Sequence, residues 1–135
     1  MVYAFSFAYE KISDEKYLGW AKTIANRHWN ARNLQTNLTP DAPSTGDRYD
    51  AHHCFTTITG PYAVLLMKCF ELTGEVMFRD QALVYLHAYL KYGWDDDTKQ
   101  WRAMLALDGT PVMAQKKAPD TMSGNPPAIS ISGAP

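Results

Sequence analysis

The polar side chains of this chain are concentrated in residues 30–53, and their types suit anion binding and proton transfer. An arginine can hold a carboxylate through two parallel hydrogen bonds, and a histidine exchanges protons near neutral pH. Aspartates supply the oxygen ligands that Ca²⁺ prefers, although the spacing here is not that of an EF-hand loop. The densest group in the stretch consists of Asp41, Asp47, Arg48, Asp50, His52 and His53.

Structural roles compete with each of these chemical roles. Asp47 and Arg48 are adjacent and suit an ion pair that holds the loop together. Asp50 suits the cap of a helical turn that begins near Ala51. Of two neighbouring histidines, one commonly packs while the other is solvated. The residues alone therefore leave a functional loop and a merely structured loop both open.

Composition restricts the classes of protein to consider. The chain has 135 residues, enough for one ordinary domain, and a formal net charge of −1. This charge balance argues against nucleic acid or an anionic membrane as a partner. No segment has the ~18 consecutive apolar residues of a membrane span. Cys54 and Cys69 do not form a disulfide framework, and we expect two buried thiols.

Hydrophobic periodicity predicts an all-α protein built from antiparallel helical hairpins. We expect one hairpin over 2–29, with Ser13 as the N-cap of its second helix, and another over 61–92, with Pro61 in a first turn. Gly93 is expected in the left-handed region after the last helix. Residues 101–113 should form a small β-hairpin around Asp108 and Gly109. Together, 1–113 form one domain, and the Pro-, Ser- and Gly-rich residues 114–135 are expected to be disordered.

An internal repeat relates the two hairpins by a shift of 61 residues. The shared pattern is an aromatic residue followed by Glu, a short turn with an acid, another aromatic and then an alanine. It pairs Tyr9 with Phe70, Ser13 with Gly74, Tyr17 with Phe78 and Ala21 with Ala82. Such a repeat implies that each hairpin buries a face against its neighbour.

The order of several motifs resembles the six-hairpin, or (α/α) toroid, proteins that process polysaccharides, and within them bacterial pectate lyase-like proteins. The matching motifs are Trp-Asn-Ala-Arg-Asn at 29–33, Leu-Thr-Pro-Asp at 38–41, Arg-Tyr-Asp-Ala-His-His at 48–53, Tyr-Gly-Trp-Asp at 92–95 and Leu-Asp-Gly-Thr-Pro-Val at 107–112. The resemblance covers residues 8–112 and implies a partial toroid. A toroid of this family has about six hairpins, whereas two are recognisable here, so we expect a fragment whose parent is periplasmic or secreted.

The resemblance implies an acidic polysaccharide or oligosaccharide as ligand and β-elimination as the reaction. Such a lyase neutralises the substrate carboxylate, removes the α-proton and protonates the leaving oxygen. Arg48 or Arg32 would take the first role, His52 or His53 the second, and Tyr49 would assist the third. Further substrate contacts are expected from Arg32, Asn33, Asp50, Trp29 and Trp94, and a possible Ca²⁺ site from Asp41 and Asp47.

Two other functions remain open. A glycoside hydrolase needs two carboxylates across the scissile bond, and the repeated Glu10 and Glu71 are candidates, although their places before the turns favour solvated roles. A helical interaction fragment without activity would instead expose apolar helix faces and associate with itself through them.

Overall fold

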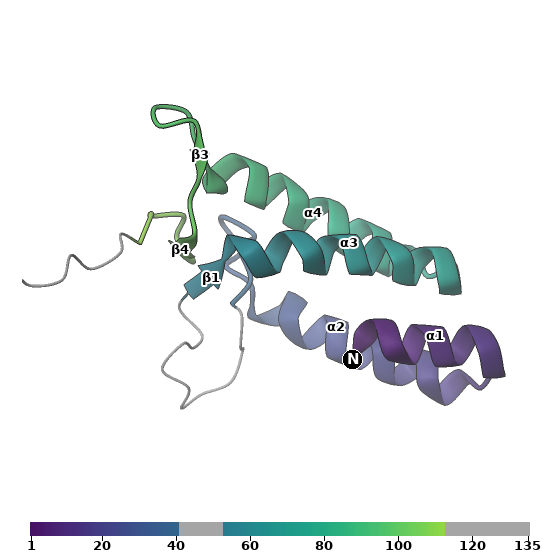
Figure 1. Ribbon diagram of the computed structural model, residues 1–135. Coiled ribbons are helices and arrows are strands. Elements are labelled where there is room, and N and C mark those ends of the chain that lie inside the picture. The colour runs from purple at the N-terminus through teal and green to yellow at the C-terminus, as the bar shows by residue number, and fades with distance from the viewer. Residues whose placement is uncertain (41–52, 113–135) are drawn as a thin grey trace, which may run out of the picture.

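The computed structural model describes residues 1–40 and 53–112, apart from the side chains of Phe55 and Thr57 (Figure 1). The expected disorder of 114–135 lies outside the described residues. So do six residues given roles in the predicted site: Asp41, Asp47, Arg48, Tyr49, Asp50 and His52.

The described part of the chain is mostly helical and contains two antiparallel helical hairpins. The first consists of α1 (Val2–Ile12) and α2 (Glu15–Ala31), and the second of α3 (Thr56–Thr73) and α4 (Val76–Gly93). Figure 1 shows that both interhelical turns lie at one end of the molecule, the turn end, and that all strands lie at the opposite end, the loop end. None of the described helices is long and apolar enough to cross a bilayer.

Two small antiparallel sheets form the loop end within the described residues. Strand β1 (His53–Phe55) pairs with β4 (Met104–Ala106), and β2 (Trp94–Asp95) pairs with β3 (Gln100–Trp101). The Thr56 backbone N–H donates to the Ala103 carbonyl at 3.1 Å, and the Thr56 hydroxyl donates to the Arg102 carbonyl. These contacts attach the start of α3 to a segment almost fifty residues later.

The main core lies between the two hairpins. The hairpins approach each other most closely through α1 and α3. Side chains of α2 and α4 fill the core beside this contact: Ala21, Ala25, Phe78, Ala82 and Tyr85 are all fully buried. Burial of each large apolar side chain contributes about 1.5–3 kcal/mol. A smaller core at the loop end consists of Leu38, Cys54, Ala88 and Leu105. Cys54 and Cys69 are both buried, as predicted.

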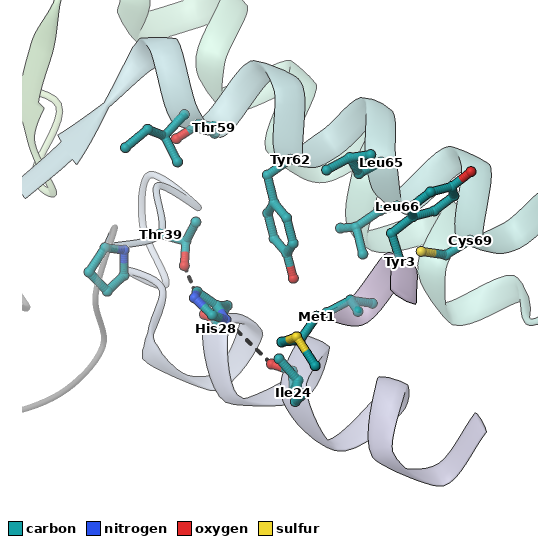
Figure 2. Close-up of a pocket in the computed structure, with 13 residues that line it drawn as sticks. Met1, Tyr3, Ile24, His28, Thr39, Thr59, Tyr62, Leu65, Leu66 and Cys69 are labelled. Carbon is teal, nitrogen blue, oxygen red and sulfur yellow. Dashed lines mark hydrogen bonds between the residues drawn. The ribbon is translucent and has the colours of Figure 1, made fainter. Parts of the chain in front are cut away.

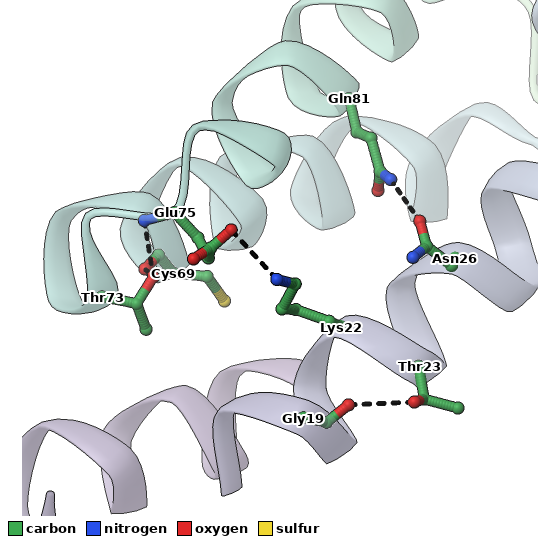
Figure 3. Close-up of polar contacts among 8 residues, drawn as sticks. All are labelled: Gly19, Lys22, Thr23, Asn26, Cys69, Thr73, Glu75 and Gln81. Carbon is green, nitrogen blue, oxygen red and sulfur yellow. Dashed lines mark hydrogen bonds and ion pairs between the residues drawn. The ribbon is translucent and has the colours of Figure 1, made fainter. Parts of the chain in front are cut away.

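Polar contacts also join α2 to α4 (Figure 3). The Lys22 ammonium lies 3.2 Å from a Glu75 carboxylate oxygen. Further along the same pair of helices, the Gln81 amide donates to Asn26 Oδ1 at 2.9 Å. The two hairpins are therefore held in one register along their length.

The backbone at the two turns confirms the internal repeat. Ser13 and Gly74 both have positive φ, 61° and 73°, and their N–H groups donate to the Tyr9 and Phe70 carbonyls, each at 2.7 Å. Ala21 and Ala82 are both fully buried. The prediction of Ser13 as an N-cap is wrong, because Ser13 ends α1. Asp14 caps α2, with its side chain accepting from the Lys16 N–H at 3.0 Å.

Two predicted features of the second hairpin are also corrected. Helix α3 begins at Thr56, five residues before the predicted 61, because the bonds of Thr56 to 102–103 fix its first turn, and Pro61 lies inside the helix. Gly93 does not have positive φ and is the last residue of α4. A Cβ atom on Gly93 would lie 3.3 Å from Thr56 Cγ2 and 3.4 Å from Trp101 Cε3, so a larger residue would need these side chains to shift by a few tenths of an ångström.

The predicted β-hairpin over 101–113 is present only in reduced form. Gly109 has φ of 91°, its N–H donates to the Ala106 carbonyl, and a single bridge joins Leu105 to Pro111. The principal partner of β4 is instead β1, which the sequence did not predict. Proline lacks the N–H of a ladder residue, and this accounts for a return limited to one bridge.

Candidate functional site

The loop end gathers the predicted site residues that the structure describes. Arg32 and Asn33 follow the end of α2, His53 begins β1, and Trp94 begins β2. These segments come from distant parts of the chain and are tied together there. The Thr36 hydroxyl donates to the Leu107 carbonyl at 2.5 Å across 71 residues of sequence.

Arg32 is engaged within its own turn. Its guanidinium lies 3.5 Å from the ring centroid of Trp29, Nη1 donates to the Trp29 carbonyl at 2.8 Å, and Nε donates to Asn37 Oδ1 at 3.1 Å. Trp29 is half-buried and makes an edge contact with Tyr85, at 5.7 Å between centroids. A sugar ring stacked on Trp29 would therefore compete with the guanidinium for a ring face.

Asn33 organises the turn that follows. Its Oδ1 accepts from the N–H groups of Gln35 and Thr36, at 2.8 and 3.1 Å. The Asn37 N–H donates to the Asn33 carbonyl at 2.7 Å, and Asn37 itself has φ of 64°. Asn33 thus holds the polar turn at the loop end, and its substrate role stays a prediction.

His53 is half-buried and pairs with Ala106 in the small sheet. Arg48, predicted to neutralise the substrate carboxylate, and His52, the alternative base, lie outside the described residues. Within 1–40 and 53–112, no group of three or more His, Cys, Asp or Glu side chains could hold a metal ion. The Asp41 and Asp47 cation site falls on the segment that the structure leaves undescribed.

Three aromatic side chains form a cluster on the surface of the loop end, which we call the aromatic cluster: Tyr89, Trp94 and Trp101. Trp101 stacks on Tyr89 with centroids 4.8 Å apart and planes 11° apart, and Trp94 meets Trp101 edge-on at 5.0 Å. Trp94 and Trp101 are 36% and 46% exposed. Tyr89 covers one face of Trp101, so the exposed parts of the two indoles are the surface that could stack against the C–H face of a pyranose.

Charged groups surround the aromatic cluster. Arg102 Nη1 donates to the carbonyls of Tyr92 and Trp94 at 3.1 and 3.0 Å, and its Nη2 lies 3.6 Å from Asp95. The N–H groups of Asp97 and Thr98 donate to Asp95 Oδ1, and these hydrogen bonds hold the pKa of Asp95 below its usual range. Asp96 pairs with Lys99 at 2.9 Å. The rim carries cations and carboxylates together.

An apolar cavity of about 250 Å³ lies between α1, α2 and α3 (Figure 2). None of the side chains that line it is Asp, Glu, Lys or Arg; its polar edge contains His28, which contacts Tyr62 with centroids 5.5 Å apart. The Tyr62 hydroxyl is buried and has no hydrogen-bond partner among the described residues, and this burial raises its pKa. A polyanion would find no charge partner in this cavity.

The carboxylates proposed for a hydrolase lie at the turn end. Glu10 is near the end of α1 and pairs with Lys11 at 3.2 Å, and Glu71 is near the end of α3; both residues are exposed. Strands β2 and β3, which contain Trp94 and Trp101, lie at the opposite end (Figure 1). The two groups of candidates therefore do not share one surface.

Sequence reasoning named Trp94 but did not combine it with Tyr89, Trp101 and Arg102. The two indoles meet because β2 pairs with β3 in the register Trp94 to Trp101. The sequence contains one pattern that could have indicated this pairing. It is the run Trp-Asp-Asp-Asp-Thr-Lys-Gln-Trp at 94–101, in which tryptophans flank a turn. The apolar cavity was missed altogether, because its walls come from three helices.

Comparison of the chain with protein-family models, with curated proteins and with solved structures gives no match.

Proposed function

We propose that this chain is a carbohydrate-binding helical-hairpin protein of the (α/α) toroid type, and that it binds a glycan on the aromatic cluster. The observation that carries the proposal is the pair of exposed indoles, Trp94 and Trp101, fixed at one end of a repeated hairpin scaffold. Stacking of aromatic rings on ligand rings needs large side chains that lose little freedom on binding.

The repeat supports the architectural part of the proposal. Two hairpins with the same turn geometry pack face to face, as the members of a hairpin array do. In such an array the connecting loops gather at one end, where they line a shared surface. The aromatic cluster lies at that end, together with Arg32, Asn33 and His53.

The resemblance adds an acidic polysaccharide as the ligand. A uronate carboxylate beside the aromatic cluster would meet Arg102 and Lys99, but also Asp96 and Asp97. Stacking, rather than net charge, therefore supplies most of the expected binding energy. We expect modest affinity for acidic and neutral oligosaccharides alike, because one stacked ring contributes only about 0.5–1.5 kcal/mol beyond its buried area.

The test is a calorimetric titration of the full chain with an oligogalacturonide and with a neutral oligosaccharide of equal length. Trp94→Ala should lower the affinity severalfold for both ligands. Phe7→Ala is the control, because Phe7 is also an exposed aromatic residue, 46% exposed, but lies on α1 of the helical scaffold. Equal binding by the two variants, or no heat with either ligand, would contradict the proposal.

β-Elimination yields unsaturated products that absorb in the ultraviolet. Following this absorbance in the oligogalacturonide mixture therefore distinguishes β-elimination from binding alone. The catalytic roles of Arg48, His52 and His53 stay predictions, and a flat trace from protein that binds the ligand would exclude them for this chain.

A further inference from the structure

The outer face of α4 is apolar and exposed at regular spacing. Val76, Leu83 and Leu90 recur every seven residues and are 45%, 47% and 56% exposed. On a helix, this spacing places the three side chains along one stripe. The stripe lies opposite the face of α4 that packs on α2, which includes Gln81 and Tyr85.

The internal repeat indicates what this face is built to contact. Three residues of α2 meet α4: Lys22 contacts Glu75, Asn26 contacts Gln81 and Trp29 contacts Tyr85 (Figure 3 shows the first two pairs). The residues 61 positions after Lys22, Asn26 and Trp29 are Leu83, His87 and Leu90. The exposed face of α4 is therefore the counterpart of the surface through which α2 contacts α4 and its N-cap residue Glu75, beside the main α1–α3 contact of the two hairpins.

The complementary half of this junction is present in the same chain. The residues 61 positions before Glu75, Gln81 and Tyr85 belong to the first hairpin. They are Asp14, Trp20 and Ile24. Trp20 is 47% exposed, although it is one of the largest apolar residues of the chain. One molecule thus carries residues at both sets of positions of the junction, although Trp20 also contacts Phe5 of α1, with ring centroids 5.3 Å apart.

From this register we propose that a second copy of the chain docks head to tail, with its Trp20 face on the Leu83–Leu90 face of α4. In this register His87 would meet the partner's Trp20, and Leu83 would lie beside the partner's Asp14. Leu90 would lie over the partner's Ile24, which is half-buried at the edge of the apolar cavity. The contact is heterologous, because the two faces differ, so addition of further copies extends an array or closes a ring. This inference concerns assembly and does not depend on glycan binding.

Sedimentation velocity of the full chain over a hundredfold range of concentration tests the proposal. The wild-type chain should shift to larger species as its concentration rises. Leu83→Glu combined with Leu90→Glu should weaken association at least ~10-fold, because it buries two unpaired charges at the junction. Leu34→Glu is the control: Leu34 is 78% exposed but lies on neither face, and this change should leave association unaltered.

Mixing experiments decide the head-to-tail arrangement. Trp20→Glu should also abolish association, and a mixture of this variant with the α4 double variant should form pairs and nothing larger, since each partner retains one intact face. Circular dichroism and thermal melting establish that every variant is folded. A wild-type chain that stays monomeric throughout, or a double variant that associates like wild type, overturns the proposal. Undiminished association of Trp20→Glu overturns the assignment of the Trp20 face.

Discussion

The turn end and the loop end of this molecule are held together by different kinds of contact. At the turn end, Ser13 and Gly74 close their helices through bonds to residues only four positions earlier. At the loop end, Thr36 bonds to Leu107 and Thr56 to Arg102, across 71 and 46 residues. The first kind of contact forms within a single hairpin. The second forms only when distant segments have already come together, so we expect the loop end to be the less stable end.

The largest expected effect is a difference in stability between alanine substitutions at Gly109 and Gly74, two glycines with positive φ. Gly109→Ala should destabilise the fold by about 2–4 kcal/mol, because a left-handed alanine costs about 1–2 kcal/mol and overpacking adds a similar amount. The added Cβ would lie 2.6 Å from Tyr92 Cδ1. Gly74→Ala at the turn end, also at positive φ but with no atom within 4 Å of its Cβ, should cost only about 1–2 kcal/mol.

Urea denaturation followed by circular dichroism measures both values. Equal losses of stability for Gly109→Ala and Gly74→Ala would show that Tyr92 yields freely, and that the loop end is less tightly packed than its contacts indicate.

A smaller effect is expected for side-chain hydrogen bonds at the two ends. Thr36→Val removes the bond to the Leu107 carbonyl and the acceptor of the buried Leu38 N–H, and should cost about 1–3 kcal/mol. Asp14→Ala removes the exposed cap of α2, where water can replace the lost acceptor, and should cost about 0.5–1 kcal/mol. Chemical denaturation of the two variants measures both losses of stability. A larger loss for Asp14→Ala than for Thr36→Val would contradict the expectation that the buried hydrogen bonds of Thr36 contribute more to stability than the exposed cap of α2.

The smallest effect is a dependence on pH confined to the loop end. Hydrogen bonds lower the pKa of Asp95 and Asp108 in the folded protein, those of Asp108 coming from Thr110. Their contribution to stability is therefore complete above the unfolded pKa, about 3.9, and is lost as the pH falls toward the lower folded pKa.

Near-ultraviolet circular dichroism reports on the aromatic cluster, and far-ultraviolet circular dichroism reports on the helices. On acidification below pH ~4, we expect the near-ultraviolet signal to decrease first. Asp95→Asn should remove part of this early change, because the amide accepts hydrogen bonds but does not titrate. Coincident loss of both signals in the wild-type chain would indicate that the two ends unfold together.

Much of the helical framework could be predicted from the sequence, because the signals for it are local. Apolar periodicity located four helices within the described residues, and the 61-residue repeat paired Ser13 with Gly74, which share one backbone conformation. Errors arose where a local signal was ambiguous. A serine before an acid suits either helix end, and Pro61 suited a first turn until Thr56 was tied to 102–103.

Only the tertiary structure decided which residues meet at the loop end. Nothing in residues 53–55 predicts pairing with 104–106, since a three-residue strand carries too little pattern to identify its partner. The same holds for Arg32, whose guanidinium covers Trp29, and for the three helices that enclose the apolar cavity. The sequence by itself determined the hairpins and their repeat, because those contacts span a few residues. The loop-end surface depended on packing between segments far apart in the chain, so three-dimensional structure was needed to assemble the aromatic cluster.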